Sequence, residues 1–175
     1  MAKSTMPEDP LGSFVLLDAP GHLLRRCHQI AVDFYTEEVG DSGPTPPQFA
    51  LLLTVYQNRG LSQVDLVRLT GIDRSTVAEM VARLLKRELL ERSRTVTDRR
   101  TNALAVTEAG EAMLRAALPA VLRAQTRAMQ PVPPAKRAEL IDLLRLLASI
   151  NGPAGAAALA MDGAEAEGET NMAEN

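Results

Sequence analysis

Several residue types that support particular kinds of chemistry are scarce in this chain of 175 residues. The single cysteine, Cys27, excludes an intramolecular disulfide framework and a cysteine-rich zinc site. Two histidines and five aromatic residues leave few groups for a metal cluster or for stacking on single-stranded nucleic acid. No apolar run approaches the roughly 18 residues that a membrane span needs, and the N-terminus does not resemble a signal peptide. We therefore expect a cytoplasmic protein with no cofactor and no membrane association.

Acidic and basic residues are distributed unevenly. The whole chain has a formal charge of −3, which is not typical of a protein that binds nucleic acid. Residues 151–175, however, contain five acidic and no basic residues, whereas residues 74–100 contain eight basic and four acidic ones. The basic excess is therefore concentrated in one central block. Residues 1–17 and 151–175 have no apolar periodicity, so we expect a flexible N-terminal arm and a disordered acidic tail.

Apolar residues recur at helical spacing over much of residues 18–150. A first helix is expected over about 18–39. A second helix begins after Thr45, because Pro46 suits a first helical position and Gln48 stands where a capping box requires it. Both helices precede the basic block.

Two shorter helices follow, each with its own capping residue. Ser62 and Asp65 fit a capping box for the first, and Asp73 caps the second, which is expected to end near Glu88. Because a tight turn at Gly71 joins them, the pair has the layout of a helix-turn-helix.

A hairpin comes next in the sequence. Thr95 and Val96 favour one strand and residues 102–106 favour the other, with a charged tip at 97–100 between them. Such a hairpin beside a helix-turn-helix forms the wing of a winged helix.

The remaining apolar periodicity predicts helices over about 107–130 and 135–150. The predicted fold class is therefore mainly α. A winged helix-turn-helix with a two-stranded wing occupies about 45–106, between flanking helices at 18–39 and 107–150.

The run from Leu61 to Gly110 resembles the winged core of MarR-type transcription regulators. Its most specific part is the hairpin tip Asp98-Arg99-Arg100 followed by residues 104–110, and the resemblance covers about residues 20–150. It implies a homodimer whose flanking helices interlock, so that two winged modules meet a palindromic site on double-stranded DNA. The chain contains no phosphate-binding glycine loop, metal-ligand spacing or nucleophile–base pair that would indicate an enzyme.

Two positions depart from the family pattern. Glu88 stands where family members often have glycine, in the turn that leads to the first strand, so the hairpin geometry is affected. Thr70 is polar where a buried apolar residue is usual. Neither departure removes the motif.

The second helix of the helix-turn-helix is expected to lie in the major groove. Arg74 suits a bidentate contact with guanine, and Glu79 suits either cytosine or the orientation of Arg83. By resemblance, Arg100 enters the minor groove, and Asp98 pairs with basic groups and stabilises the wing. The other predicted DNA contacts are Ser62, Gln63, Ser75, Thr76, Arg94 and Arg99.

The first helix has two histidines and two arginines beside its apolar face, which suits an anion with an apolar body. It resembles the first helix of MarR-type regulators of aromatic-acid breakdown, which sense the free acid or its coenzyme A thioester. The expected function is thus a repressor that leaves its operator when such an effector binds. The resemblance places the pocket between the dimer helices and the winged module, with a predicted lining of His22, Arg26, Ile30, Phe49 and Leu53. Alternatively, the charged residues of the first helix form only surface or inter-subunit pairs.

Two other functions stay open at this point. Some family members sense peroxides through a cysteine in the first helix, and Cys27 has Arg26 and His28 as sequence neighbours. Because Cys27 falls on the apolar face with Leu24 and Ala31, we expect a buried, unreactive thiol. A winged helix used only for protein contacts is less consistent with the basic hairpin tip.

Overall fold

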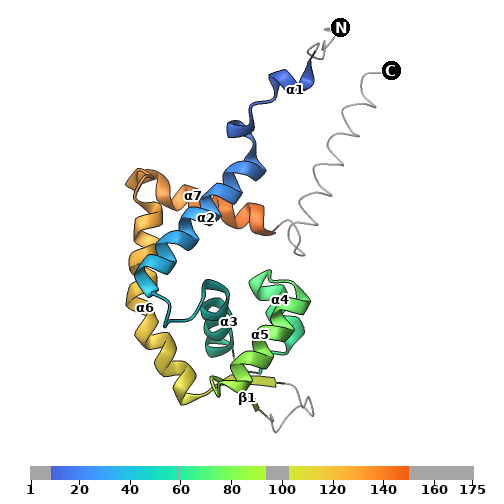
Figure 1. Cartoon of the computed structure of the whole chain (residues 1–175), viewed down its shortest axis with the longest axis vertical. Coiled ribbons are helices and arrows are strands. Elements are labelled where there is room, and N and C mark those ends of the chain that lie inside the picture. The colour runs from blue at the N-terminus through green and yellow to red at the C-terminus, as the bar shows by residue number, and fades with distance from the viewer. Residues whose placement is uncertain (1–8, 59, 94–102, 150–175) are drawn as a thin grey trace, which may run out of the picture.

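The computed structural model describes residues 9–58, 60–93 and 103–149, and Figure 1 shows how its elements are arranged. In chain order the helices are α1 (Pro10–Ser13), α2 (Pro20–Val39), α3 (Pro46–Gln57), α4 (Gln63–Thr70), α5 (Arg74–Lys86), α6 (Glu108–Met129) and α7 (Arg137–Ser149). The two strands are β1 (Leu90–Ser93) and β2 (Ala103–Val106). Within the described residues, no helix is both long enough and apolar enough to span a membrane.

The predicted helix-turn-helix is present, and its capping groups are the expected ones. The hydroxyl of Ser62 accepts from the backbone N–H of Asp65, whose carboxylate accepts in return from the Ser62 N–H at 3.0 Å. Gly71 ends α4 in the left-handed conformation, with φ of 69°. Asp73 caps α5 by accepting from the N–H of Thr76 at 2.9 Å. Local polar chemistry therefore fixes both ends of the turn.

The first strand begins earlier than predicted. Residues 95–96 favour a strand by composition, but the structure pairs β1 with β2 in antiparallel register, with Leu90 opposite Val106. Leu90 and Leu104 are both buried, so burial rather than β propensity determines where the described pairing begins. Residues 94–102, which include the predicted wing tip, lie outside the described residues.

One apolar core joins α3, α4, α5, the two strands and one face of α6. Burying a leucine or valine side chain stabilises a fold by about 1.5–3 kcal/mol, so this cluster dominates the stability of the winged module. Its most deeply buried members are Leu51, Leu52, Val55, Leu66, Val77, Val81, Leu84, Leu90 and Leu104.

The outer helices are far less enclosed by their own chain. Of the residues described in α2 only Tyr35 is buried, and of those described in α7 none is. Tyr35 donates its hydroxyl to the carbonyl of Pro44 at 2.8 Å, and burial raises its pKa to about 12. Figure 1 shows the C-terminal end of α2 against α6, while the N-terminal end of α2 extends away from the winged module.

The N-terminal arm contains regular structure that the sequence analysis did not predict. Pro10 occupies the first position of the single-turn helix α1, and the carboxylate of Asp9 accepts from the N–H of Leu11 at 3.1 Å. A 3-10 turn follows, and α2 begins at Pro20 rather than Asp18. Proline suits a helix start because its φ is already helical and it lacks an N–H.

Candidate DNA-binding face and effector cleft

The starts of α4 and α5 and the strand β1 surround one concave surface, which encloses a volume of about 570 Å³. Its lining includes three of the predicted DNA contacts, namely Ser62, Gln63 and Arg74. Arg92 of β1 also lines it. The sequence indicates this residue only as one of the basic residues in 74–100 and not as a DNA contact. Its position depends on the strand pairing, which residue spacing alone did not locate.

The hydroxyl groups at the start of α5 take part in the helix cap. Ser75 donates its Oγ proton to Asp73 at 2.6 Å, and the Thr76 backbone N–H donates to the same oxygen. These hydrogen bonds hold the pKa of Asp73 well below its ordinary value. Asp73 therefore stays ionised and keeps the first turn of α5 in place. Contacts of Ser75 and Thr76 with DNA stay predictions.

Glu79 and Arg83 form a pair on the exposed side of α5. Arg83 donates through Nη2 to Glu79 Oε2 at 2.8 Å, and both side chains are more than half exposed. This contact is one of the two roles predicted for Glu79, the orientation of Arg83. Exposed pairs of this kind contribute only about 0.3–0.5 kcal/mol, so either side chain can leave the pair at little cost. Contacts of Glu79 and Arg83 with DNA stay predictions.

Predicted wing residues Arg94, Asp98, Arg99 and Arg100 lie outside the described residues. The base of the wing is described, and it is joined directly to α6. Thr107 donates its hydroxyl to the carbonyl of Glu88 at 2.6 Å, and its backbone N–H donates to a neighbouring carbonyl at 3.2 Å.

The turn between α5 and β1 is strained and tightly packed. Glu88 is the non-glycine residue with a positive φ, 56°, among those described, so the departure noted in the sequence has a conformational consequence. At Gly110, an added Cβ would lie 2.2 Å from the carbonyl oxygen of Leu89. Glycine is therefore required where the first turn of α6 contacts this turn.

Thr70, the other departure, finds partners within its own helix end. Its hydroxyl donates to the carbonyl of Leu66 at 2.7 Å and accepts from the N–H of Ile72 at 3.3 Å. A polar side chain is tolerated here because both hydrogen bonds are local.

A smaller cleft, of about 90 Å³, lies between α3 and α6. It is lined by Phe49, Leu53, Tyr56, Glu111, Leu114, Arg115 and Leu118. Two of the five predicted pocket residues, Phe49 and Leu53, are thus brought together. The other three, His22, Arg26 and Ile30, are described but do not line this cleft. They lie in α2, where His22 is half-buried and the other two are exposed.

The rim of this cleft carries a polar cluster that the sequence analysis missed. Arg115 donates through Nε and Nη2 to one oxygen of Glu111, at 2.8 and 2.5 Å, and through Nη2 to the Tyr56 hydroxyl at 3.3 Å. The Glu111 carboxylate raises the pKa of Arg115. Glu111 and Arg115 have the spacing of a helical pair, but Tyr56 is 59 positions away, so only the fold reveals the cluster.

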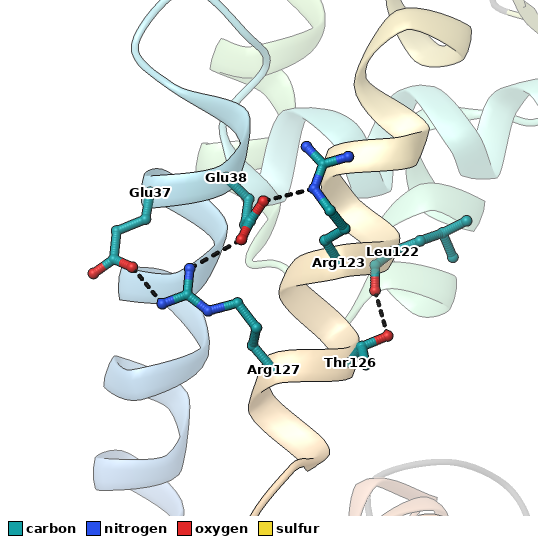
Figure 2. A network of polar contacts seen from close by, with 6 residues as sticks. All are labelled: Glu37, Glu38, Leu122, Arg123, Thr126 and Arg127. Carbon is teal, nitrogen blue, oxygen red and sulfur yellow. Dashed lines mark hydrogen bonds and ion pairs between the residues drawn. The ribbon is translucent and has the colours of Figure 1, made fainter.

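A second polar network fixes the C-terminal end of α2 on α6 (Figure 2). Glu38 accepts from Arg123 at 2.8 Å and from Arg127 at 3.0 Å, while Arg127 also donates to Glu37 at 2.6 Å. The guanidinium of Arg127 lies 4.4 Å from the ring centre of Phe34. The two arginines lower the pKa of Glu38, so it stays ionised at neutral pH.

The expected burial of Cys27 is wrong within a single chain. Cys27 is exposed, as are Leu24 and Ala31 on the same face of α2. The apolar face is present, but none of the elements that the structure describes covers it at this position.

A winged helix-turn-helix with polar and basic side chains at the start of its second helix defines a DNA-binding regulator of the winged-helix class. Residues 45–101 match the model of the MarR family. The chain is 30% identical over 158 residues to the HTH-type transcriptional repressor NicR of Pseudomonas putida, covering 89% of this chain and 100% of NicR. The chain belongs to the MarR family of transcriptional regulators, as the resemblance in the sequence implied.

Solved structures agree with this assignment. BpsR of Bordetella bronchiseptica, whose DNA binding is regulated by 6-hydroxynicotinic acid, is 31% identical with a TM-score of 0.72, covering 77% of this chain and 96% of BpsR. The repressor CouR, solved on a 23-mer DNA duplex, is 29% identical with a TM-score of 0.68, covering 76% of this chain and 94% of CouR. CouR has also been solved with p-coumaroyl-CoA. The predicted mainly α winged fold is confirmed.

Proposed function

We propose that this protein is a homodimeric repressor that binds a palindromic operator in double-stranded DNA and leaves it when a small aromatic acid binds. The observation that carries the proposal is the meeting of Ser62, Gln63, Arg74 and Arg92 around one concave surface. Two helix starts and two guanidinium groups at one surface suit phosphate and guanine contacts.

The apolar faces of the outer helices support a homodimer. Leu143 and Leu147 of α7 and Leu23 and Leu24 of α2 are between 43% and 52% exposed in the single chain. A second copy that covers these faces would remove a large apolar area from water. It would also place two winged modules at the spacing of two operator half-sites.

The cleft between α3 and α6 supports a free acid as the effector rather than a coenzyme A thioester. Its volume, about 90 Å³, is smaller than the roughly 150 Å³ cavity that holds benzene in an engineered protein. A single ring can therefore insert only in part, with its polar end at the rim. BpsR, which responds to 6-hydroxynicotinic acid, offers a parallel. His22, Arg26 and Ile30 stay predicted contacts of an effector or of the second subunit.

DNA binding is tested by selecting duplexes from a random pool with the purified protein and measuring affinity by fluorescence anisotropy. Arg74→Ala should weaken binding to the selected duplex roughly tenfold or more. Arg145→Ala, which removes an exposed arginine paired with Asp142 on α7, is the matched control and should leave affinity unchanged. If a dimer neutralises roughly eight phosphates, log K against log salt has a slope of about −7. Equal affinities of the two variants would contradict the proposed DNA-binding face.

A further inference from the structure

We infer that Arg115 binds the carboxylate of the effector at the rim of the α3–α6 cleft, and that Glu111 competes with that carboxylate for the same guanidinium. This inference rests on the proposed function, because it assigns a residue to the proposed effector cleft. It places a specific anchor on α6, whereas the sequence predicts the cationic groups of the pocket on the first helix.

The chemistry of the lining favours an aromatic acid. Phe49, Leu53, Leu114 and Leu118 give the cleft an apolar wall, and Arg115 is the cationic group among its described lining residues. The Arg115 side chain is 69% exposed, so its guanidinium can move towards a ligand at the rim. A ring against the apolar wall would leave its carboxylate within reach of this guanidinium.

The hydrogen-bond geometry leaves a better interaction available to Arg115. Its Nε and Nη2 both donate to the same oxygen, Oε1 of Glu111. A carboxylate that approaches in the plane of the guanidinium can instead accept one bond on each oxygen, the bidentate arrangement that arginine favours. The existing pair is an exposed helical one, which is weak, so an incoming carboxylate can displace it.

Tyr56 adds a second donor at the same place. Its hydroxyl oxygen accepts from Arg115 Nη2 at 3.3 Å, which leaves its own proton free to be donated to a ligand oxygen. An aromatic carboxylate would then be held by the guanidinium and the phenol together. An amide of the same size has no negative charge and only one acceptor oxygen, so it cannot form the bidentate ion pair.

Displacement of Glu111 would take place one helical turn from the base of the wing. Glu111 donates its backbone N–H to the carbonyl of Thr107 at 2.9 Å, and Thr107 donates its hydroxyl to Glu88. A ligand that shifts the first turn of α6 would therefore act on the turn between α5 and β1.

The test uses the full chain and isothermal titration with benzoate, salicylate and 6-hydroxynicotinate, with benzamide as the uncharged counterpart. Arg115→Gln should weaken binding of the carboxylates by roughly 10- to 100-fold, since it removes a charged hydrogen-bond partner. It should weaken benzamide binding far less, because benzamide has no charge to lose a partner for. Glu111→Gln should tighten carboxylate binding by roughly two- to fivefold, because it removes the competing charge. Arg145→Gln, from the exposed pair on α7, should change neither.

A second measurement separates this inference from the proposed function. Anisotropy on the selected duplex should show that Arg115→Gln binds DNA normally but is no longer released by the carboxylates that release the unmodified protein. If the acids bind the unmodified protein and Arg115→Gln equally well, Arg115 is not the anchor, although the proposed repressor stands. If Arg115→Gln weakens benzoate and benzamide equally, the residue contributes packing and the inference is again wrong. If none of the acids binds the unmodified protein, both the inference and the proposed effector class fail.

Discussion

The winged module and the flanking helices bury their apolar residues in different ways. Leu51, Leu66 and Leu84 of the module have no exposed surface at all, whereas Leu143 and Leu147 of α7 keep about half of theirs. The module therefore forms its core from its own chain, and the flanking helices present apolar faces outward. In physical terms, the folding of the module depends on one molecule, while the stability of the flanking region depends on what covers it.

The largest effect should come from a cavity in the module. Leu66→Ala is expected to lower the free energy of unfolding by about 2–5 kcal/mol, because the residue is fully buried. Chemical denaturation monitored by circular dichroism measures this change, and the loss should not vary with protein concentration. Leu69→Ala on the same helix, where half of the side chain is exposed, is the control and should change stability far less. Similar losses at the two positions would contradict a core centred on α4.

Changes in α7 should act through association instead. Leu143→Ala combined with Leu147→Ala truncates two partly exposed side chains in each subunit. The dimer dissociation constant should rise by roughly 100-fold if each of the four truncated side chains contributes about 0.7 kcal/mol to the interface. Sedimentation at several concentrations measures this constant. Leu146→Ala should have a smaller effect, because Leu146 lies outside the apolar stripe that Leu140, Leu143, Leu144 and Leu147 form at helical spacing. A protein that is monomeric before any substitution would disprove the role given to these helices.

The junction between the two regions can be weakened selectively. Thr107→Val keeps the side-chain shape but removes the hydroxyl that donates to Glu88 and caps α6 by accepting from the Gly110 N–H. Stability should fall by about 1–2 kcal/mol, as measured by thermal unfolding. Thr36→Val is the control, since the Thr36 hydroxyl bonds only to the preceding turn of α2. No difference between the two valine variants would show that this junction contributes little.

Features set by neighbouring residues could be predicted from the sequence, and features set by distant contacts could not. The caps at Ser62 and Asp73 were predicted because their partners lie within three residues. The start of β1 was missed because burial of Leu90 decides it. The cluster of Tyr56 and Arg115 was missed because the two residues are far apart in the chain.

Cys27 illustrates a different limit. Its helical spacing places it correctly on an apolar face, but burial also requires something to cover that face, and in the single chain Cys27 is exposed. Periodicity therefore predicts which face of a helix is apolar without saying whether the same chain or another one covers it.

The smallest expected effect is a gain in stability at the turn between α5 and β1. Glu88 adopts a φ of 56°, which is unfavourable for a residue with a Cβ by about 1–2 kcal/mol, whereas glycine adopts it freely. Because glycine also gains about 0.5–1 kcal/mol of freedom in the unfolded chain, Glu88→Gly should stabilise the protein by up to about 1 kcal/mol. The same change at Glu79, inside α5, should destabilise it by about 1 kcal/mol. Thermal unfolding of both variants tests this prediction. A gain in stability at position 88 with a loss at position 79 is expected only if residue 88 is left-handed. A loss of stability at both positions would contradict that conformation.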